Sequence, residues 1–188
     1  MNLNFKAKIP AERVGVLVGP SGSVKKRIES MCHVKLVINS ESGDIDIWGE
    51  EDLEDPTFLF KAQNITLAVG RGFSPEKAYR LMNDEESFHI VDLREVLGRS
   101  RSNIDRLKSR LIGKEGKTRK IFEETTNAYI SIYGHTVSII GKTDELDIVK
   151  GGISKLLSGC RHKTVYNFLG RKRHEMKRER LKLWDEYT

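Results

Sequence analysis

Two short loops bounded by glycines hold the residue types best suited to binding phosphate. The second loop, Gly113-Lys114-Glu115-Gly116, is followed at once by Lys117, Arg119 and Lys120. Glycines let another backbone come close, and a helix that starts at such a loop offers unpaired N–H groups and the positive end of its dipole. Four cations around the loop add attraction for anions. This arrangement indicates non-covalent binding of a phosphate backbone.

The first loop, Gly19-Pro20-Ser21-Gly22, has the same spacing with weaker chemistry. Pro20 lacks an N–H donor, while Ser21 adds a hydroxyl. Its nearest cations are Lys25, Lys26 and Arg27, one helical turn further on. A glycine loop between helices is in most proteins a structural feature only. We therefore expect the second loop to be the stronger site.

Both loops belong to an internal repeat with an offset of 94 residues. Val16–Glu29 matches Arg110–Glu123, and Val34–Ile38 matches Ala128–Ile132. Each copy places a basic segment and then an apolar hairpin after its loop. A duplicated arrangement of this kind favours a functional role for the loops over a purely structural one.

Each copy predicts a strand, two helices, a hairpin of two strands and a closing helix. Apolar spacing, β-branched runs and turn residues define these elements. The predicted opening strands are Phe5–Ile9 and Phe88–Val91, the helices after the loops Ser23–Met31 and Lys117–Thr126, the hairpins Val34–Ile38 with Asp44–Trp48 and Tyr129–Tyr133 with Thr136–Ile140, and the closing helices Pro56–Val69 and Asp144–Leu157. The fold class is α+β, with a three-stranded antiparallel sheet in each copy and helices on one face.

The repeat divides the chain into two domains and a tail. We expect a first domain over 1–83 with a trailing helix, in which Ser74 caps the helix that Pro75 begins. The second domain, 84–160, carries about eleven extra residues, which include Gly98–Asn103 and predict a basic bend between two short helices. The remainder, 161–188, is a basic helical tail, in which Arg171–Arg180 predicts a helix that is either frayed and solvated or a second phosphate-contacting surface. Trp184 and Tyr187 could dock this tail or stack on a base.

Composition and charge limit the classes of function. The 188 residues include 33 basic and 27 acidic ones, a net charge of +6. That charge is uneven: Arg99–Lys120 carries a local +7 and the tail +5, whereas Glu41–Asp55 holds eight acidic residues and no basic one. Two cysteines make no disulfide framework, and no apolar run could span a membrane. The opening residues lack the apolar segment of a signal peptide, so we expect a cytoplasmic protein.

The patterns for catalysis and for metal binding are absent or incomplete. Gly116-Lys117-Thr118 and Gly141-Lys142-Thr143 suggest a nucleotide-binding P-loop, but its required glycine is replaced by Leu111 and Thr136. Cys160 and His162 have no second pair to complete a zinc site. We therefore expect no enzymatic activity, no cofactor and no metal.

The loops and the element order together resemble the KH domain in its type I, or eukaryotic, form. Several longer segments are similar to the tandem-KH ribosome-biogenesis family called partner of Nob, in its short archaeal form; these are Gly70–Ala78, Gly98–Ser100, Arg110–Arg119 and Ser131–Gly141. In KH domains the Gly-x-x-Gly loop clamps the backbone of about four single-stranded nucleotides. The bases are expected in an apolar groove beside the middle strand.

The resemblance implies sets of RNA-binding residues in both domains. In the second domain these are Ile112, Gly113, Lys114, Glu115, Gly116, Lys117, Thr118, Arg119, Lys120, Tyr129 and Ile130. In the first domain the weaker equivalents are Val18, Gly19, Pro20, Ser21, Gly22, Val24, Lys25, Lys26 and Leu36. Accessory basic contacts are expected from Arg99, Arg101, Arg171, Lys172 and Arg173. Glu115 departs from the family, because it puts a negative charge beside the expected phosphate.

The same resemblance implies a function and partners. The family binds near the 3′ end of pre-small-subunit ribosomal RNA and assists the Nob endonuclease and the dimethyladenosine methyltransferase without doing chemistry itself. Ribosomal RNA, these proteins or a translation factor are therefore the expected partners. The alternative from the residues alone is a protein adaptor that docks partners on the acidic stretch Glu41–Asp55 and has weak RNA affinity. The amino-acid sequence does not determine which RNA sequence is recognised, the oligomeric state or the packing of the domains.

Overall fold

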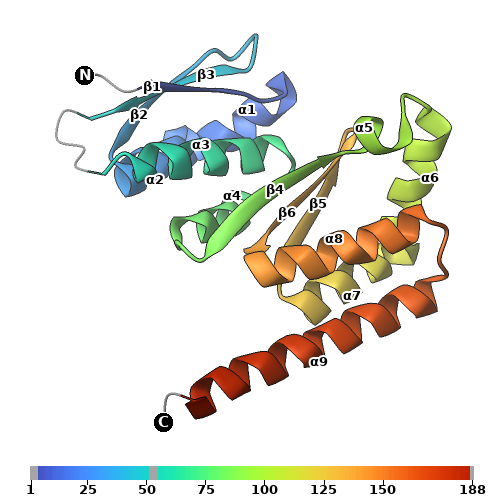
Figure 1. Cartoon of the computed structure of the whole chain (residues 1–188). Coiled ribbons are helices and arrows are strands. Elements are labelled where there is room, and N and C mark those ends of the chain that lie inside the picture. Colours follow the sequence, from blue (N-terminus) through green and yellow to red (C-terminus); the bar gives the residue numbers. More distant parts are fainter. Residues whose placement is uncertain (1–3, 51–54, 187–188) are drawn as a thin grey trace. The chain divides into compact units, whose positions relative to one another are not determined.

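The structure, a computed structural model, describes residues 4–50 and 55–186, with the side chains of Arg180 and of 182–186 left aside. The chain forms two compact units, residues 1–88 and 89–188. The first unit contains β1 (Asn4–Lys8), α1 (Ala11–Val18), α2 (Ser23–Cys32), β2 (Val34–Ile38), β3 (Asp44–Gly49), α3 (Thr57–Gly70) and α4 (Pro75–Ala78). Figure 1 shows α1, α2 and α3 on one face of its sheet.

The second unit repeats this order and adds helices at two places. Its elements are β4 (Glu86–Asp92), which begins at the end of the first unit, then α5 (Leu93–Leu97), α6 (Arg101–Ile112), α7 (Lys117–Thr126), β5 (Tyr129–Tyr133), β6 (Thr136–Lys142), α8 (Thr143–Leu157) and α9 (His162–Glu186). The additions are α5 and α9. Figure 1 shows α9 as a long helix beside α7 and α8.

Both sheets have three strands, in the orders β1-β3-β2 and β4-β6-β5. The pairs β1–β3, β2–β3 and β5–β6 are antiparallel, with Leu36 opposite Ile47 and Ile130 opposite Ile139. The predicted α+β class and the βααββα order in each copy are confirmed. The strand that is second in sequence in each copy, β2 or β5, lies at the edge of its sheet.

Buried and exposed side chains alternate along the strands of the first unit, which places its core on one face of the sheet. Ala7, Leu36 and Ile47 are buried, whereas their neighbours Lys6 and Lys35 are exposed. Full burial of one aliphatic side chain contributes about 1.5–3 kcal/mol. The helices supply the other half of this core with Leu17, Ile28, Leu59 and Ile65. This packing fixes α1 and α2, and with them the loop between the two helices.

An arginine of the helix before each loop holds the end of the closing helix. The Arg13 guanidinium donates to the Val69 carbonyl at 2.9 Å and to the Phe73 carbonyl at 2.8 Å. Arg110 donates in the same way to the carbonyls of Leu156 and Cys160. The last four carbonyls of a helix have no intrahelical partner, so these bonds satisfy acceptors and fasten the first helix of each copy to its last.

Two local predictions need correction, and the tail adds an observation. Ser74 precedes α4, but its hydroxyl bonds the Glu76 carboxylate and makes no cap to the backbone. In the insertion, the bend is confined to Gly98–Ser100, because Arg101 already begins the twelve-residue α6. The tail begins as a packed part of the second unit: Val165 and Leu169, which precede the stretch Arg171–Arg180, are fully buried in its core.

Candidate nucleic-acid interface

The second loop joins α6 to α7. At two of its positions the backbone has angles that glycine adopts more readily than other residues. Gly113 has φ 73° and ψ 176°, and Gly116 has φ 77° and ψ 8°. Between them Glu115 is also left-handed, at φ 53°. The N–H of Gly116 bonds the Gly113 carbonyl at 3.3 Å, which closes a single tight turn. The initial turn of α7, which begins at Lys117, therefore starts directly at the loop with N–H groups that have no intrahelical partner.

The two glycines of this loop serve different purposes. A Cβ on Gly113 would lie 2.8 Å from the backbone nitrogen of Thr118 and still closer to its hydroxyl. A Cβ on Gly116 would meet no atom within 4 Å. Gly113 is thus required by close contact with α7, whereas Gly116 is required only by its backbone angles and leaves open space beside the loop.

Two of the predicted cations are best placed to attract an anion. Lys114 and Lys117 are exposed, and within the described part of the chain neither takes part in an ion pair. Arg119 lies 3.9 Å from Glu123 and Lys120 lies 3.7 Å from Glu124, both as i,i+4 pairs on α7. Exposed pairs of this kind are weak, so Arg119 and Lys120 still contribute charge at longer range.

Two residues assigned to the groove are not accessible there. Thr118 is buried, and its hydroxyl lies 2.9 Å from the Tyr166 hydroxyl of α9. Ile130 points its side chain into the core, and its backbone N–H donates to Glu123 Oε1 at 2.9 Å. The remaining two fit the prediction better: Ile112 is 37% exposed at the end of α6, and Tyr129 is half-buried on the edge strand β5.

The first loop repeats the geometry of the second. Gly19 has φ 71° and ψ 175°, Ser21 takes the left-handed place of Glu115, and Gly22 has φ 77°. The floor under Gly19 is Val24, whose backbone nitrogen would lie 3.0 Å from an added Cβ. Pro20 and Lys26 are exposed, and Val18 and Val24 are half-buried. The backbone of the two loops is therefore nearly the same, and their difference is chemical.

A carboxylate lies beside the edge strand in both units. Glu29 Oε1 accepts from the Leu36 N–H at 2.8 Å, as Glu123 does from Ile130. Lys25 lies 3.7 Å from Glu29, in the position that Arg119 occupies beside Glu123. Leu36 itself is buried, so its side chain, like that of Ile130, is not a groove contact. These edge-strand N–H groups are satisfied within the protein.

The accessory basic residues lie on two separate elements of the second unit. Arg99 is exposed in the bend between α5 and α6, and Arg101 begins α6, 3.8 Å from Asp105. On α9, Arg171 and Lys172 lie 3.7 Å and 2.7 Å from the same residue, Glu175, whose pKa the Lys172 hydrogen bond lowers. Arg173, next along α9, is half-buried. Arg171 and Lys172 thus share one carboxylate, and ion pairs between side chains as exposed as these are weak.

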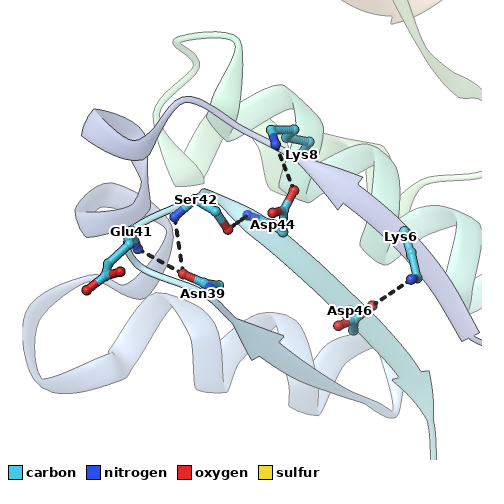
Figure 2. Close-up of polar contacts among 7 residues, drawn as sticks. All are labelled: Lys6, Lys8, Asn39, Glu41, Ser42, Asp44 and Asp46. Carbon is cyan, nitrogen blue, oxygen red and sulfur yellow. Dashed lines mark hydrogen bonds and ion pairs between the residues drawn. The ribbon is translucent and has the colours of Figure 1, made fainter.

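The acidic stretch of the first unit is partly neutralised across the sheet. Figure 2 shows Asp44 and Asp46 on β3 facing Lys8 and Lys6 on β1, with separations of 3.1 and 3.9 Å. Hydrogen bonds from the Ser42 and Lys8 side chains hold the pKa of Asp44 below its ordinary value. The acidic residues Glu51, Asp52 and Glu54 lie outside the described residues. A strongly acidic docking face is therefore not assembled by the described part of this hairpin.

Three residues near the second loop were missed at the level of sequence. Tyr166 bonds Thr118, His162 Nε2 lies 2.9 Å from the Arg110 carbonyl, and the Arg110 side chain holds the end of α8. The available signal was Val165 and Leu169, an apolar pair at helical spacing that marks the start of the tail as a packed helix. The expected docking or stacking of Trp184 and Tyr187 lies outside the side chains that the structure describes.

Comparison with known proteins places both units in one family. Residues 87–174 match the eukaryotic-type KH domain (KH-domain type I), and residues 4–55 match the KH domain. The KH domain-containing protein MJ0443 of Methanocaldococcus jannaschii is 44% identical over 177 residues, which cover 94% of this chain and 77% of that protein. RNA-binding protein pno-1 of Caenorhabditis elegans is 27% identical over 135 residues, 70% of this chain and 48% of that protein.

A solved structure gives the same result. The chain matches one in a crystal structure of an a/eIF2alpha-aDim2p-rRNA complex from Pyrococcus horikoshii OT3, with a TM-score of 0.88 and 40% identity over 93% of this chain and 96% of that one. The similarity therefore extends over both units and beyond the loops themselves. The chain belongs to the tandem KH-domain family that includes the PNO1 and Dim2 RNA-binding proteins.

Proposed function

We propose that this protein binds single-stranded ribosomal RNA near the 3′ end of the pre-small-subunit RNA and assists its maturation without catalysing a reaction. The observation that carries the proposal is the second loop, where exposed Lys114 and Lys117 flank the uncapped start of α7. The rRNA complex that contains the Pyrococcus relative supports RNA as the ligand. Electrostatic attraction between lysines and phosphates requires no cofactor. We propose that it acts on RNA in the cytoplasm.

The phosphate backbone is expected to supply most of the affinity. Each cation that neutralises a phosphate of a single strand contributes about 0.7 to the slope of log K against log salt. Loss of Lys114 and Lys117 is therefore expected to lower that slope by about 1.4. A ligand that binds chiefly by apolar contacts would leave the slope unchanged.

The experiment is a fluorescence-anisotropy titration of a short RNA with the sequence of the 3′ end of the small-subunit RNA. The test variant is Lys114→Asp with Glu115→Asp, which changes the side-chain charge of the second loop from zero to −2. The matched variant in the first loop is Pro20→Asp with Ser21→Asp. We expect the second-loop variant to lose binding with an unchanged circular dichroism spectrum, and the first-loop variant to lose less. Unchanged affinity in the second-loop variant would refute the proposal.

A second candidate function is the docking of a translation-factor subunit. The specific observation is that the Pyrococcus complex contains a/eIF2alpha as well as rRNA. We expect the purified chain to retain such a partner after RNase treatment; loss of every protein partner with the RNA would contradict this. Association with the Nob endonuclease and the dimethyladenosine methyltransferase is proposed from the resemblance to the partner-of-Nob family and is tested in the same pull-down.

A further inference from the structure

Two side chains of α9 contact the helices on either side of the second loop. His162 Nε2 lies 2.9 Å from the carbonyl of Arg110, in the last turn of α6. The Tyr166 hydroxyl lies 2.9 Å from the hydroxyl of Thr118, the second residue of α7. Residues four apart lie on the same face of a helix, and the two rings are 6.0 Å apart. One face of α9 therefore reaches both ends of the loop.

The contact with α6 is reciprocal. A carbonyl only accepts hydrogen bonds, so His162 Nε2 is the donor to Arg110. The Arg110 side chain in turn donates to the carbonyls of Leu156 and Cys160, which precede α9. His162 thus fastens the beginning of α9 to α6, while Arg110 fastens the end of α8 and the residue Cys160 before α9 to the same helix. Arg110, three residues before Gly113, therefore fixes the position of the segment that leads into α9.

The contact with α7 leads directly to the loop backbone. Thr118 is 3% exposed and lies beneath Gly113, which has no room for a Cβ above it. In the first unit the equivalent floor is Val24 beneath Gly19, an apolar side chain that needs no hydrogen bond. The second loop instead rests on a buried hydroxyl, and a buried hydroxyl requires a partner. Tyr166 is that partner.

We propose that the beginning of α9 braces the second loop, and that His162 and Tyr166 are positioning residues for phosphate binding. The proposal rests on the proposed function, because it concerns the loop that binds RNA. Neither side chain needs to touch the RNA. Their effect is to hold the start of α7 and the loop in one conformation, so that less conformational freedom is lost when a phosphate binds.

The principal test is Tyr166→Phe, which removes one hydroxyl and keeps the half-buried ring. We expect RNA affinity to fall about fivefold, with faster hydrogen exchange at the amides of Gly113 and Gly116. The salt slope stays that of the unaltered protein, because no phosphate-contacting cation is lost. The matched control is Tyr79→Phe, which makes the same chemical change in the first unit and leaves affinity unchanged.

A double variant separates positioning from general stability. Thr118→Val with Tyr166→Phe removes both hydroxyls and rebuilds the apolar floor that Val24 gives the first loop. We expect affinity to return to within twofold of the unaltered protein, since no buried hydroxyl is left without a partner. A role in stability alone would change the unfolding temperature of the single variant and leave its RNA affinity and loop exchange unaltered.

The outcomes distinguish this proposal from the proposed function. Loss of binding in Lys114→Asp/Glu115→Asp, together with affinity and loop exchange in Tyr166→Phe equal to those of the unaltered protein, would overturn the brace and leave the function standing. If the unaltered protein binds no RNA, the proposed function fails, and hydrogen exchange alone decides about the brace. Faster exchange at Gly113 and Gly116 in Tyr166→Phe would then support it, and unchanged exchange would refute it.

Discussion

The two glycines of the second loop allow a quantitative test of how the loop is built. We compare Gly113→Ala with Gly116→Ala, which add the same methyl group at sites three residues apart. Both glycines have positive φ values, at 73° and 77°. Only Gly113 lies against the next helix, where an added Cβ would approach the backbone nitrogen of Thr118 to 2.8 Å.

The expected losses of folding free energy follow from the backbone angles of each glycine and from the space around each added methyl group. At Gly113, φ 73° with ψ 176° lies in a region that is almost exclusive to glycine, which costs about 1–3 kcal/mol for alanine. Contact with Thr118 adds about 1–3 kcal/mol of overpacking. At Gly116, φ 77° with ψ 8° is left-handed helical and costs about 1–2 kcal/mol, with open space around the methyl. Gly113→Ala is therefore expected to be the more destabilising change by about 2 kcal/mol.

The assay is urea unfolding of the full chain, followed by circular dichroism and by hydrogen exchange of α7 amides. Because the two units can unfold separately, the exchange data assign the loss of stability to the second unit. The first loop provides an independent replicate. An added Cβ on Gly19 lies 3.0 Å from the Val24 nitrogen, whereas at Gly22 the nearest atom is Lys26 Cε at 3.9 Å. Equal costs for the two glycines of either loop would refute the reasoning.

Two further predictions concern titratable side chains. Cys32 is fully buried, and this burial raises its pKa to about 11. At pH 8 we therefore expect a thiol reagent to modify the half-buried Cys160 rapidly and Cys32 only on unfolding. Mass spectrometry of the labelled peptides checks this. Burial, assisted by Lys150, lowers the pKa of His89, so the folded state favours its neutral form. That contribution to stability is present above the unfolded pKa of about 6.5 and is lost as the pH falls below it. The unfolding temperature of His89→Gln should therefore fall less than that of the unaltered protein between pH 7.5 and 5.5, and equal falls would contradict the assignment.

The helices and strands were predictable because the same sequence pattern occurs in both copies of the internal repeat. The strands Val34–Ile38 and Tyr129–Tyr133 and the helix Lys117–Thr126 have the bounds expected from pattern alone. Alternating β-branched residues and the glycines at the loop ends mark these boundaries locally. Where one copy was ambiguous, the other supplied the missing signal. The placement of both loops between helices was predictable for the same reason.

The accessibility of individual site residues was not predictable in this way. Thr118 and Ile130 are placed by packing between elements that are distant in sequence: Thr118 is covered from α9, 48 residues later, and the Ile130 N–H is taken by a carboxylate of α7. A spacing argument gives the helix face or the strand direction, but it does not give what covers that face. The burial of Val165 and Leu169 was the information needed to see that α9 lies over α7.

Comparison of the two loops separates what the loop conformation requires from what the second unit adds. The first loop adopts nearly the same backbone angles as the second, at Gly19, Ser21 and Gly22, on the apolar floor of Val24. A hydroxyl at this floor is therefore not needed to form the loop. In the second unit the floor is Thr118, and its hydroxyl is held by a helix that the first unit lacks. The unit with the more basic loop is thus also the one whose loop is tied to an additional element, which is the arrangement expected where the loop must be rigid to bind.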